Sequence, residues 1–178
     1  MGMAATAACH PEPVEAGPPL LDLGGVTKAF QTVVANRDVS LAIRPGEIHA
    51  VLGENGAGKS TLMKMIYGVF PPDAGEMRWN GEPVALTSPA QARKLGIGMV
   101  FQHFSLFESL TVAENISLTV PDSVARLAGR IREIGQRFAL PVNPDSLVHS
   151  LSVGERQRVE IIRCLLQEPR LIIMGEPT

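Results

Sequence analysis

The chain has 178 residues, enough for one hydrophobic core and few for two, so we expect a single domain. Its 16 basic and 18 acidic residues give a formal net charge of −2, which provides no general attraction to nucleic acid or to anionic lipid. Because no apolar run approaches the about 18 residues of a membrane span, and the N-terminus lacks the pattern of a secretory signal, we expect a cytoplasmic protein without direct membrane insertion.

Composition favours an α/β protein. Hydrophobic residues make up 45% of the chain but aromatic residues only 4%, which suits parallel strands buried on both faces by aliphatic side chains. The two cysteines, Cys9 and Cys164, lie far apart in sequence and form neither a disulfide framework nor a metal-binding spacing, so we expect free thiols.

The N-terminal region is predicted to contain a tail followed by short strands. Residues 1–19 mix Ala, Pro, Glu and Gly without periodicity, which predicts a disordered tail before a domain that begins at residue 20. Apolar segments at Val26–Phe30 and Val39–Ile43 predict an antiparallel part of the sheet. Phe30 is notable because aromatic residues are rare here: it is either an ordinary core residue or a face on which an adenine ring stacks.

The segment Gly53–Thr61 has the sequence G-E-N-G-A-G-K-S-T, which is the pattern of a phosphate-binding loop. An apolar run at 48–52 predicts a strand before it, and residues 59–67 predict a helix after it that ends at Gly68. Glycines allow successive backbone N–H groups to face the phosphates, and the helix N-terminus adds positive potential. Lys59 is therefore expected to reach the β- and γ-phosphates of a nucleoside triphosphate, and Ser60 to bind Mg²⁺. The chain lacks the Asn-Lys-x-Asp element that reads guanine, which favours ATP.

The middle of the chain is predicted to return to the sheet. An Asn80–Gly81 turn follows an alternating strand, and Ser88 is the expected N-cap of a helix over residues 88–95. The next buried strand, 97–101, ends at Gln102. Polar side chains at the carboxyl ends of parallel strands face the ligand crevice, so Gln102 is either a site residue that meets Mg²⁺ or the attacking water, or an ordinary loop residue.

The remainder is predicted to be mostly helical. Amphipathic patterns over residues 103–148 indicate an inserted helical region, and Ser152 with Glu155 forms a capping box that begins another helix. This helix end is either an ordinary cap or a second anion-binding site. A third buried strand, Leu171–Met174, precedes Gly175 and Glu176.

Taken together, these elements resemble the ATP-binding domain of ABC transporters from Leu20 to the last residue. Five motifs occur in the family's order: Phe30 matches the aromatic A-loop, residues 53–61 Walker A, Gln102 the Q-loop, residues 151–155 the signature, and residues 171–176 Walker B. Residues 87–102, 108–115 and the signature further resemble the tandem ATPases of simple-sugar and nucleoside importers.

The resemblance implies a P-loop NTPase fold with a parallel core sheet, an N-terminal antiparallel part and a helical subdomain at about 103–155. It implies a nucleotide site formed by Phe30 and Walker A, completed in trans by the signature of a second ABC ATPase domain, either a tandem half or a second copy. Gln102 and Glu176 would be catalytic, with Ser60 and Gln102 holding Mg²⁺. Transmembrane permease subunits would hold the protein at the cytoplasmic side of the membrane. The nucleotide-binding residues so implied are Phe30, Gly53, Glu54, Asn55, Gly56, Ala57, Gly58, Lys59, Ser60 and Thr61, with Ser152, Val153, Gly154 and Glu155 in trans.

Two departures from the family pattern leave alternatives open. Gly175 stands where Walker B normally has the aspartate that helps to hold Mg²⁺. The family's D-loop, switch histidine and second ATPase half are expected beyond residue 178 of a longer protein. The leading hypothesis is an ATP-hydrolysing importer subunit. The alternatives are a catalytically impaired nucleotide-binding fragment and a soluble ABC ATPase of DNA repair or translation, which the lack of long heptads and of a basic patch disfavours.

Overall fold

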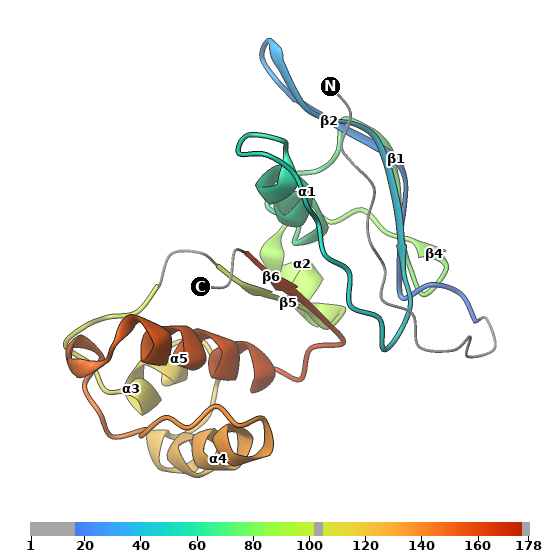
Figure 1. The fold of residues 1–178 in the computed structure, drawn as a ribbon. Helices are drawn as coiled ribbons and strands as arrows, with labels where there is room; N and C mark the ends of the chain where they lie inside the picture. Colours follow the sequence, from blue (N-terminus) through green and yellow to red (C-terminus); the bar gives the residue numbers. More distant parts are fainter. Residues whose placement is uncertain (1–16, 102–104, 176–178) are drawn as a thin grey trace. The chain divides into compact units, whose positions relative to one another are not determined.

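The computed structural model describes residues 17–101 and 105–175. The chain divides into two compact units, Met1–Ala92 and Arg93–Thr178, and each is described by itself (Figure 1). Most of the predicted N-terminal tail, Cys9, Gln102 and Glu176 lie outside the described residues.

The first unit contains a four-stranded antiparallel sheet with the order β2-β1-β3-β4. Its strands are β1 (Leu21–Phe30), β2 (Val33–Ile43), β3 (Ala74–Trp79) and β4 (Glu82–Pro83). Leu21, Leu23 and Val26 of the central strand β1 are buried and belong to the hydrophobic core. Asn80 and Gly81 have φ of 50° and 84°, the conformation of the tight turn that their sequence predicts. Both predicted N-terminal strands are confirmed, although each is longer than its apolar segment.

Helix α1 (Lys59–Ile66) follows the phosphate-binding loop, and α2 (Pro89–Lys94) follows Ser88, as the sequence predicts. The prediction of a strand over residues 48–52 is wrong, because the only β-structure in this segment is an isolated bridge at His49. Ile48 and Leu52 are 83% and 58% exposed. The physical reason is that a parallel strand forms only when its backbone hydrogen-bonds to a neighbouring strand. An apolar run in the sequence does not by itself supply that neighbour.

The second unit contains a parallel pair, β5 (Ile97–Val100) and β6 (Leu171–Met174). Its register runs from Ile97 opposite Leu171 to Val100 opposite Met174. Gly98 of β5 faces Cys164, since a Cβ built on Gly98 would lie 2.4 Å from Cys164 Sγ. Cys164 is a buried free thiol, as predicted, and burial raises its pKa to about 11.

The rest of the second unit is helical, with α3 (Val112–Ser117), α4 (Val124–Arg137), the 3₁₀ turn η1 (Val148–Ser150) and α5 (Val153–Leu165). Thr111, Ser123 and Ser152 cap the three α-helices with their side-chain oxygens. The amphipathic pattern of α4 is confirmed, because Leu127 and Ile131 are buried in a core shared with α3 and α5. Among the helices of residues 17–101 and 105–175, none has the length and apolarity needed to cross a membrane.

The close approach of Gly98 to Cys164 predicts a coupled pair. Gly98→Ala should lower the free energy of unfolding by about 1–3 kcal/mol, because the new methyl group would overlap Cys164 Sγ. In the double variant with Cys164→Ala, much of this cost should disappear, since the overlapping sulfur is gone. Urea denaturation of the two single variants and the double variant measures the coupling.

The matched control is Gly129→Ala in α4, where an added Cβ meets nothing within 4 Å. This variant should gain up to about 1 kcal/mol, because alanine has the higher helix propensity. Additive effects of Gly98→Ala and Cys164→Ala would show that the two residues do not compete for the same space.

Candidate functional site

The phosphate-binding loop of the first unit leads directly into the N-terminus of α1. Gly56 and Gly58 have φ of 83° and 85°, a left-handed conformation that residues with a Cβ rarely adopt. Gly58 is the N-cap of α1, so no side chain accepts hydrogen bonds from the first backbone N–H groups of the helix. No acidic residue occupies the first turn. The first backbone N–H groups of α1 have no partner within the helix, so this end of α1 is suited to an anion.

Lys59 lies across the loop that precedes it. Its Nζ donates hydrogen bonds to the carbonyl oxygens of Gly53, at 2.7 Å, and Glu54, at 2.9 Å. The ammonium group is thereby held beside the loop glycines, where the phosphates are expected. The side chain of Ser60 is exposed in the first turn, and Thr61 is half-buried beside it. Glu54, Asn55 and Gly56 are exposed, and Ala57 donates its N–H to the Glu54 carbonyl oxygen over 3.1 Å.

The loop is fixed to strand β2 by close packing at Gly58. A Cβ built on Gly58 would lie 2.1 Å from the carbonyl oxygen of Ala35. Asn36 Nδ2 donates a hydrogen bond of 3.2 Å to the Gly58 carbonyl oxygen, and the Asn36 side chain is buried. Sequence reasoning missed Asn36. Asparagine is disfavoured in strands, so an asparagine at position 36 of a predicted sheet region is the sequence feature that could have indicated a special role.

Phe30 ends β1 and lies opposite Val33 of β2, so it belongs to the same pair of strands that supports the loop. It is 43% exposed, so it is not an ordinary core residue. Phe30 and the loop at Gly58 therefore both adjoin β2. The stacking role of Phe30 stays a prediction.

The signature segment begins α5 in the second unit. Ser152 and Glu155 form the predicted capping box: Ser152 N–H and Oγ donate to Glu155 Oε2 at 2.9 and 2.7 Å, and Glu155 N–H donates to Ser152 Oγ at 3.3 Å. The Ser152 hydroxyl and then its backbone N–H hold the pKa of Glu155 below its ordinary value. Val153 is 62% exposed, and a Cβ on Gly154 would meet nothing within 4 Å. This helix end is therefore open to another molecule.

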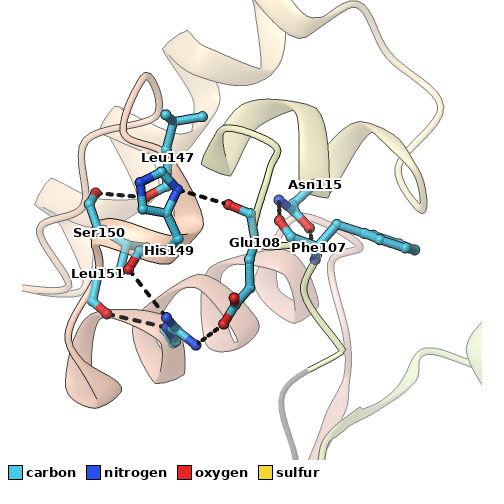
Figure 2. Close-up of polar contacts among 8 residues, drawn as sticks. Phe107, Glu108, Asn115, Leu147, His149, Ser150 and Leu151 are labelled. Carbon is cyan, nitrogen blue, oxygen red and sulfur yellow. Dashed lines mark hydrogen bonds and ion pairs between the residues drawn. The ribbon is translucent and has the colours of Figure 1, made fainter.

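An arginine network fixes the approach to the signature (Figure 2). Arg156 donates to Glu108 Oε1 at 3.0 Å, to the Leu151 carbonyl oxygen at 3.2 Å and to the His149 carbonyl oxygen at 3.4 Å. The buried Asn115 side chain fixes the neighbouring turn, because it accepts from Phe107 N–H at 2.7 Å and donates to the Phe107 carbonyl oxygen at 3.0 Å. Sequence reasoning assigned no role to Arg156 or Asn115.

A second buried polar group links α5 to the segment after Gln102. Glu160 Oε1 accepts from Ser105 N–H at 3.0 Å, and its other oxygen pairs with Arg163. Burial raises the pKa of the Glu160 carboxyl above its ordinary value, and the Arg163 charge opposes that shift. Sequence reasoning also missed Glu160, because an i, i+3 pair of opposite charges usually indicates a solvent-exposed helix face.

The predicted catalytic residues Gln102 and Glu176 lie outside the described residues, so their roles stay predictions. The parallel register places Val100 and Met174 side by side at the carboxyl ends of β5 and β6. Gly175 N–H donates to the Val100 carbonyl oxygen at 3.1 Å, which continues the ladder.

Comparison with known proteins identifies the family of this chain. The ABC transporter family model matches residues 36–178. The chain is 44% identical over 165 residues to the guanosine import ATP-binding protein NupO of Bacillus subtilis, covering 89% of this chain and 32% of that protein. It is 46% identical over 167 residues to the ribose import ATP-binding protein RbsA 1 of Rubrobacter xylanophilus, covering 90% of this chain and 33% of that protein. The chain thus spans about a third of the length of these curated relatives.

Among solved structures, the fold is similar to cbiO1 from Clostridium perfringens, which is part of the ABC transporter complex cbiONQ. The TM-score is 0.76 with 28% identity, covering 90% of this chain and 66% of that chain. A nucleotide-free ATP-binding cassette from an ABC transporter matches with a TM-score of 0.74 and 26% identity, over 90% of this chain and 70% of that one. The expected P-loop NTPase fold class is confirmed, and the chain belongs to the ABC transporter family.

Proposed function

We propose that this chain is the ATP-binding and ATP-hydrolysing part of an ABC importer that takes up a simple sugar or a nucleoside. The observation that carries the proposal is the phosphate loop: a helix N-terminus without a side-chain cap, preceded by left-handed glycines and crossed by the Lys59 ammonium. The names of the guanosine and ribose import relatives support the transport role and the class of solute.

The proposed chemistry assigns the triphosphate to residues 53–61 and the base to Phe30. Lys59 would neutralise phosphate charge, and backbone N–H groups at the start of α1 would orient the β- and γ-phosphates. Glu176 is proposed as the general base for the attacking water and Gln102 as a residue that positions it; a group of this kind contributes about 10²- to 10⁴-fold to the rate. Ser152 to Glu155 would bind the nucleotide held by a second ABC ATPase domain.

Mg²⁺ is proposed to join the site through Ser60 and Gln102, and when bound it would neutralise charge on the phosphates. The exposed Ser60 side chain in the first turn of α1 fits this role, because its hydroxyl oxygen is available as a ligand. Gly175, directly after β6, offers no side-chain oxygen. Among the described residues Ser60 therefore fits the ion and Gly175 does not, and Gln102 is the other protein ligand proposed.

The proposed partners are a second ABC ATPase domain, as a tandem half or a second copy, and transmembrane permease subunits that place the protein at the cytoplasmic face of the membrane. Neither nucleic acid nor direct membrane insertion is part of the proposal. ATP-dependent uptake of ribose or guanosine by vesicles containing the full-length protein and its permease tests the transport role. Absence of ATP-dependent uptake of any sugar or nucleoside would contradict it.

A second candidate function is a nucleotide-binding domain with impaired hydrolysis, and Gly175 is the observation that favours it. The boundaries of the helical subdomain at about 103–155 and the individual site residues remain part of these proposals. ATP turnover in the Gly175→Asp and Glu176→Gln variants, described below, separates the two functions.

Lys59→Met should weaken ATP binding by about tenfold or more, because it removes the charge held beside the loop at Gly53 and Glu54. Lys64→Met is the matched control, since Lys64 lies in the last turn of the same helix. Isothermal titration with ATP measures both. Equal loss of affinity in the two variants would show that the loop lysine has no special role.

Gly175→Asp should raise Mg²⁺-dependent ATP turnover, because the new carboxylate could help to hold the ion. Turnover by the native chain that disappears in Glu176→Gln would support the hydrolysing function and contradict the impaired one. Turnover only in Gly175→Asp would support the impaired function. The measurement is phosphate release with and without Mg²⁺.

Ser152→Ala and Thr111→Ala each remove the N-cap of a capping box, on α5 and α3 respectively, so each should cost about 1 kcal/mol of stability. Only Ser152→Ala should also lower ATP turnover beyond the loss explained by unfolding, because only Ser152 is proposed to contact nucleotide. Turnover is measured in whichever background, native or Gly175→Asp, hydrolyses ATP. Equal turnover in both variants would contradict the proposed role of the signature.

A further inference from the structure

Phe30 is paired with a second aromatic residue, Phe70, which no sequence motif indicates. The two ring centroids are 5.2 Å apart and the ring planes are inclined at 82°, an edge-to-face arrangement. Such a pair covers at most one face of each ring. Phe30 stays 43% exposed beside Phe70, so part of its surface remains accessible to a planar base.

The end of helix α1 determines the position of Phe70. Gly68 has φ of 75°, and its N–H donates to the Met65 carbonyl oxygen, while Val69 N–H donates to the Lys64 carbonyl oxygen, both at 2.9 Å. A Cβ on Gly68 would lie 2.7 Å from the Ser88 carbonyl oxygen, so the exit of the chain from α1 is tightly packed. The helix whose N-terminus follows the phosphate loop thus also places Phe70.

An ion pair holds the two aromatic residues in this arrangement. Lys28 Nζ lies 2.6 Å from Asp73 Oδ1 and 5.7 Å from the centroids of both rings. Asp73 Oδ2 accepts from Ala29 N–H at 2.8 Å, and Asp73 N–H donates to the Thr27 carbonyl oxygen at 2.8 Å. Asp73 therefore ties the segment that carries Phe70 to the strand end that carries Phe30.

Strand β2 connects this aromatic pair to the phosphate loop. Val33 of β2 lies opposite Phe30, and Ala35, two residues further along β2, contacts Gly58. Two residues of a strand span about 7 Å. Phe30, through its partner Val33, and the phosphate loop, through Gly58, are therefore both held against β2, at positions a short distance apart along that strand.

We propose that Phe70 is a positioning residue for the nucleotide base: it packs against Phe30 and, with the Lys28–Asp73 ion pair, holds the Phe30 ring in the orientation that stacks on adenine. This inference rests on the proposed function, because it deepens the assignment of the ATP site. Phe70 acts through Phe30, and the base is the part of the ligand that it affects.

The test compares ATP with inorganic tripolyphosphate, which has the phosphates but no base. Phe70→Ala in the full chain should weaken ATP binding by about three- to tenfold, because the unsupported Phe30 ring loses its fixed orientation, and should leave tripolyphosphate binding unchanged. Phe70→Tyr should restore ATP affinity. Asp73→Asn should weaken ATP binding in the same base-dependent way, since it removes the charge that holds Lys28.

The matched control is Phe138→Ala in the second unit. Phe138 is 46% exposed, close to the 43% of Phe30, and it also lies beside a cation, with Arg137 Cζ 5.2 Å from its centroid. This variant should bind both ligands as the native chain does. Circular dichroism of each variant records whether the fold is kept.

Three outcomes would overturn the inference. Equal losses of ATP and tripolyphosphate affinity in Phe70→Ala would show a general structural role, and unchanged ATP affinity would show no role at all. In both cases the native chain still binds ATP, so the proposed function stands. If the native chain binds neither ligand, the proposed function fails, and the inference fails with it.

Discussion

The contact between Gly58 and the Ala35 carbonyl oxygen is the constraint on which the nucleotide site of the first unit depends. A side chain at Gly58 would overlap β2, and its left-handed backbone would also be strained. Because glycine satisfies both conditions, the N-terminus of α1 packs directly on the sheet, and the buried Asn36 amide completes the junction. The same strand, β2, pairs with the end of β1 that carries Phe30, so one strand supports both of the segments proposed to bind the base and the phosphates.

The second unit fixes its open helix end by polar contacts that come from elsewhere in the unit. Arg156 joins α5 to Glu108 and to the backbone just before the signature, and Glu160 joins α5 to Ser105. Buried or half-buried groups of this kind are costly unless every donor and acceptor is satisfied, so they specify one arrangement of the segments they join. In the proposed importer, such rigidity would allow α5 and the segment after Gln102 to move together.

The backbone of Gly175 is hydrogen-bonded in the sheet, because its N–H extends the pairing between β5 and β6 by one residue. The strand that supports Walker B is therefore built without an aspartate at this place. Backbone pairing and metal binding use different groups of the same residue. A change at Gly175 can for this reason alter the proposed hydrolysis while the parallel pair remains.

Sequence alone determined the features that depend on neighbouring residues: the phosphate loop and α1, the turn at Asn80, the capping box at Ser152, and the apolar strands on either side of the helical region. It could not determine which segments far apart in the chain meet. The apolar run at 48–52 forms no strand, and the contacts of Phe70 with Phe30 and of Asn36 with Gly58 arise only because the end of β1 meets the segment after α1 and the start of α1 meets β2. The physical reason is that caps and turns are local hydrogen-bonded units, whereas ladders, ring pairs and buried amides require a partner that only the tertiary structure supplies.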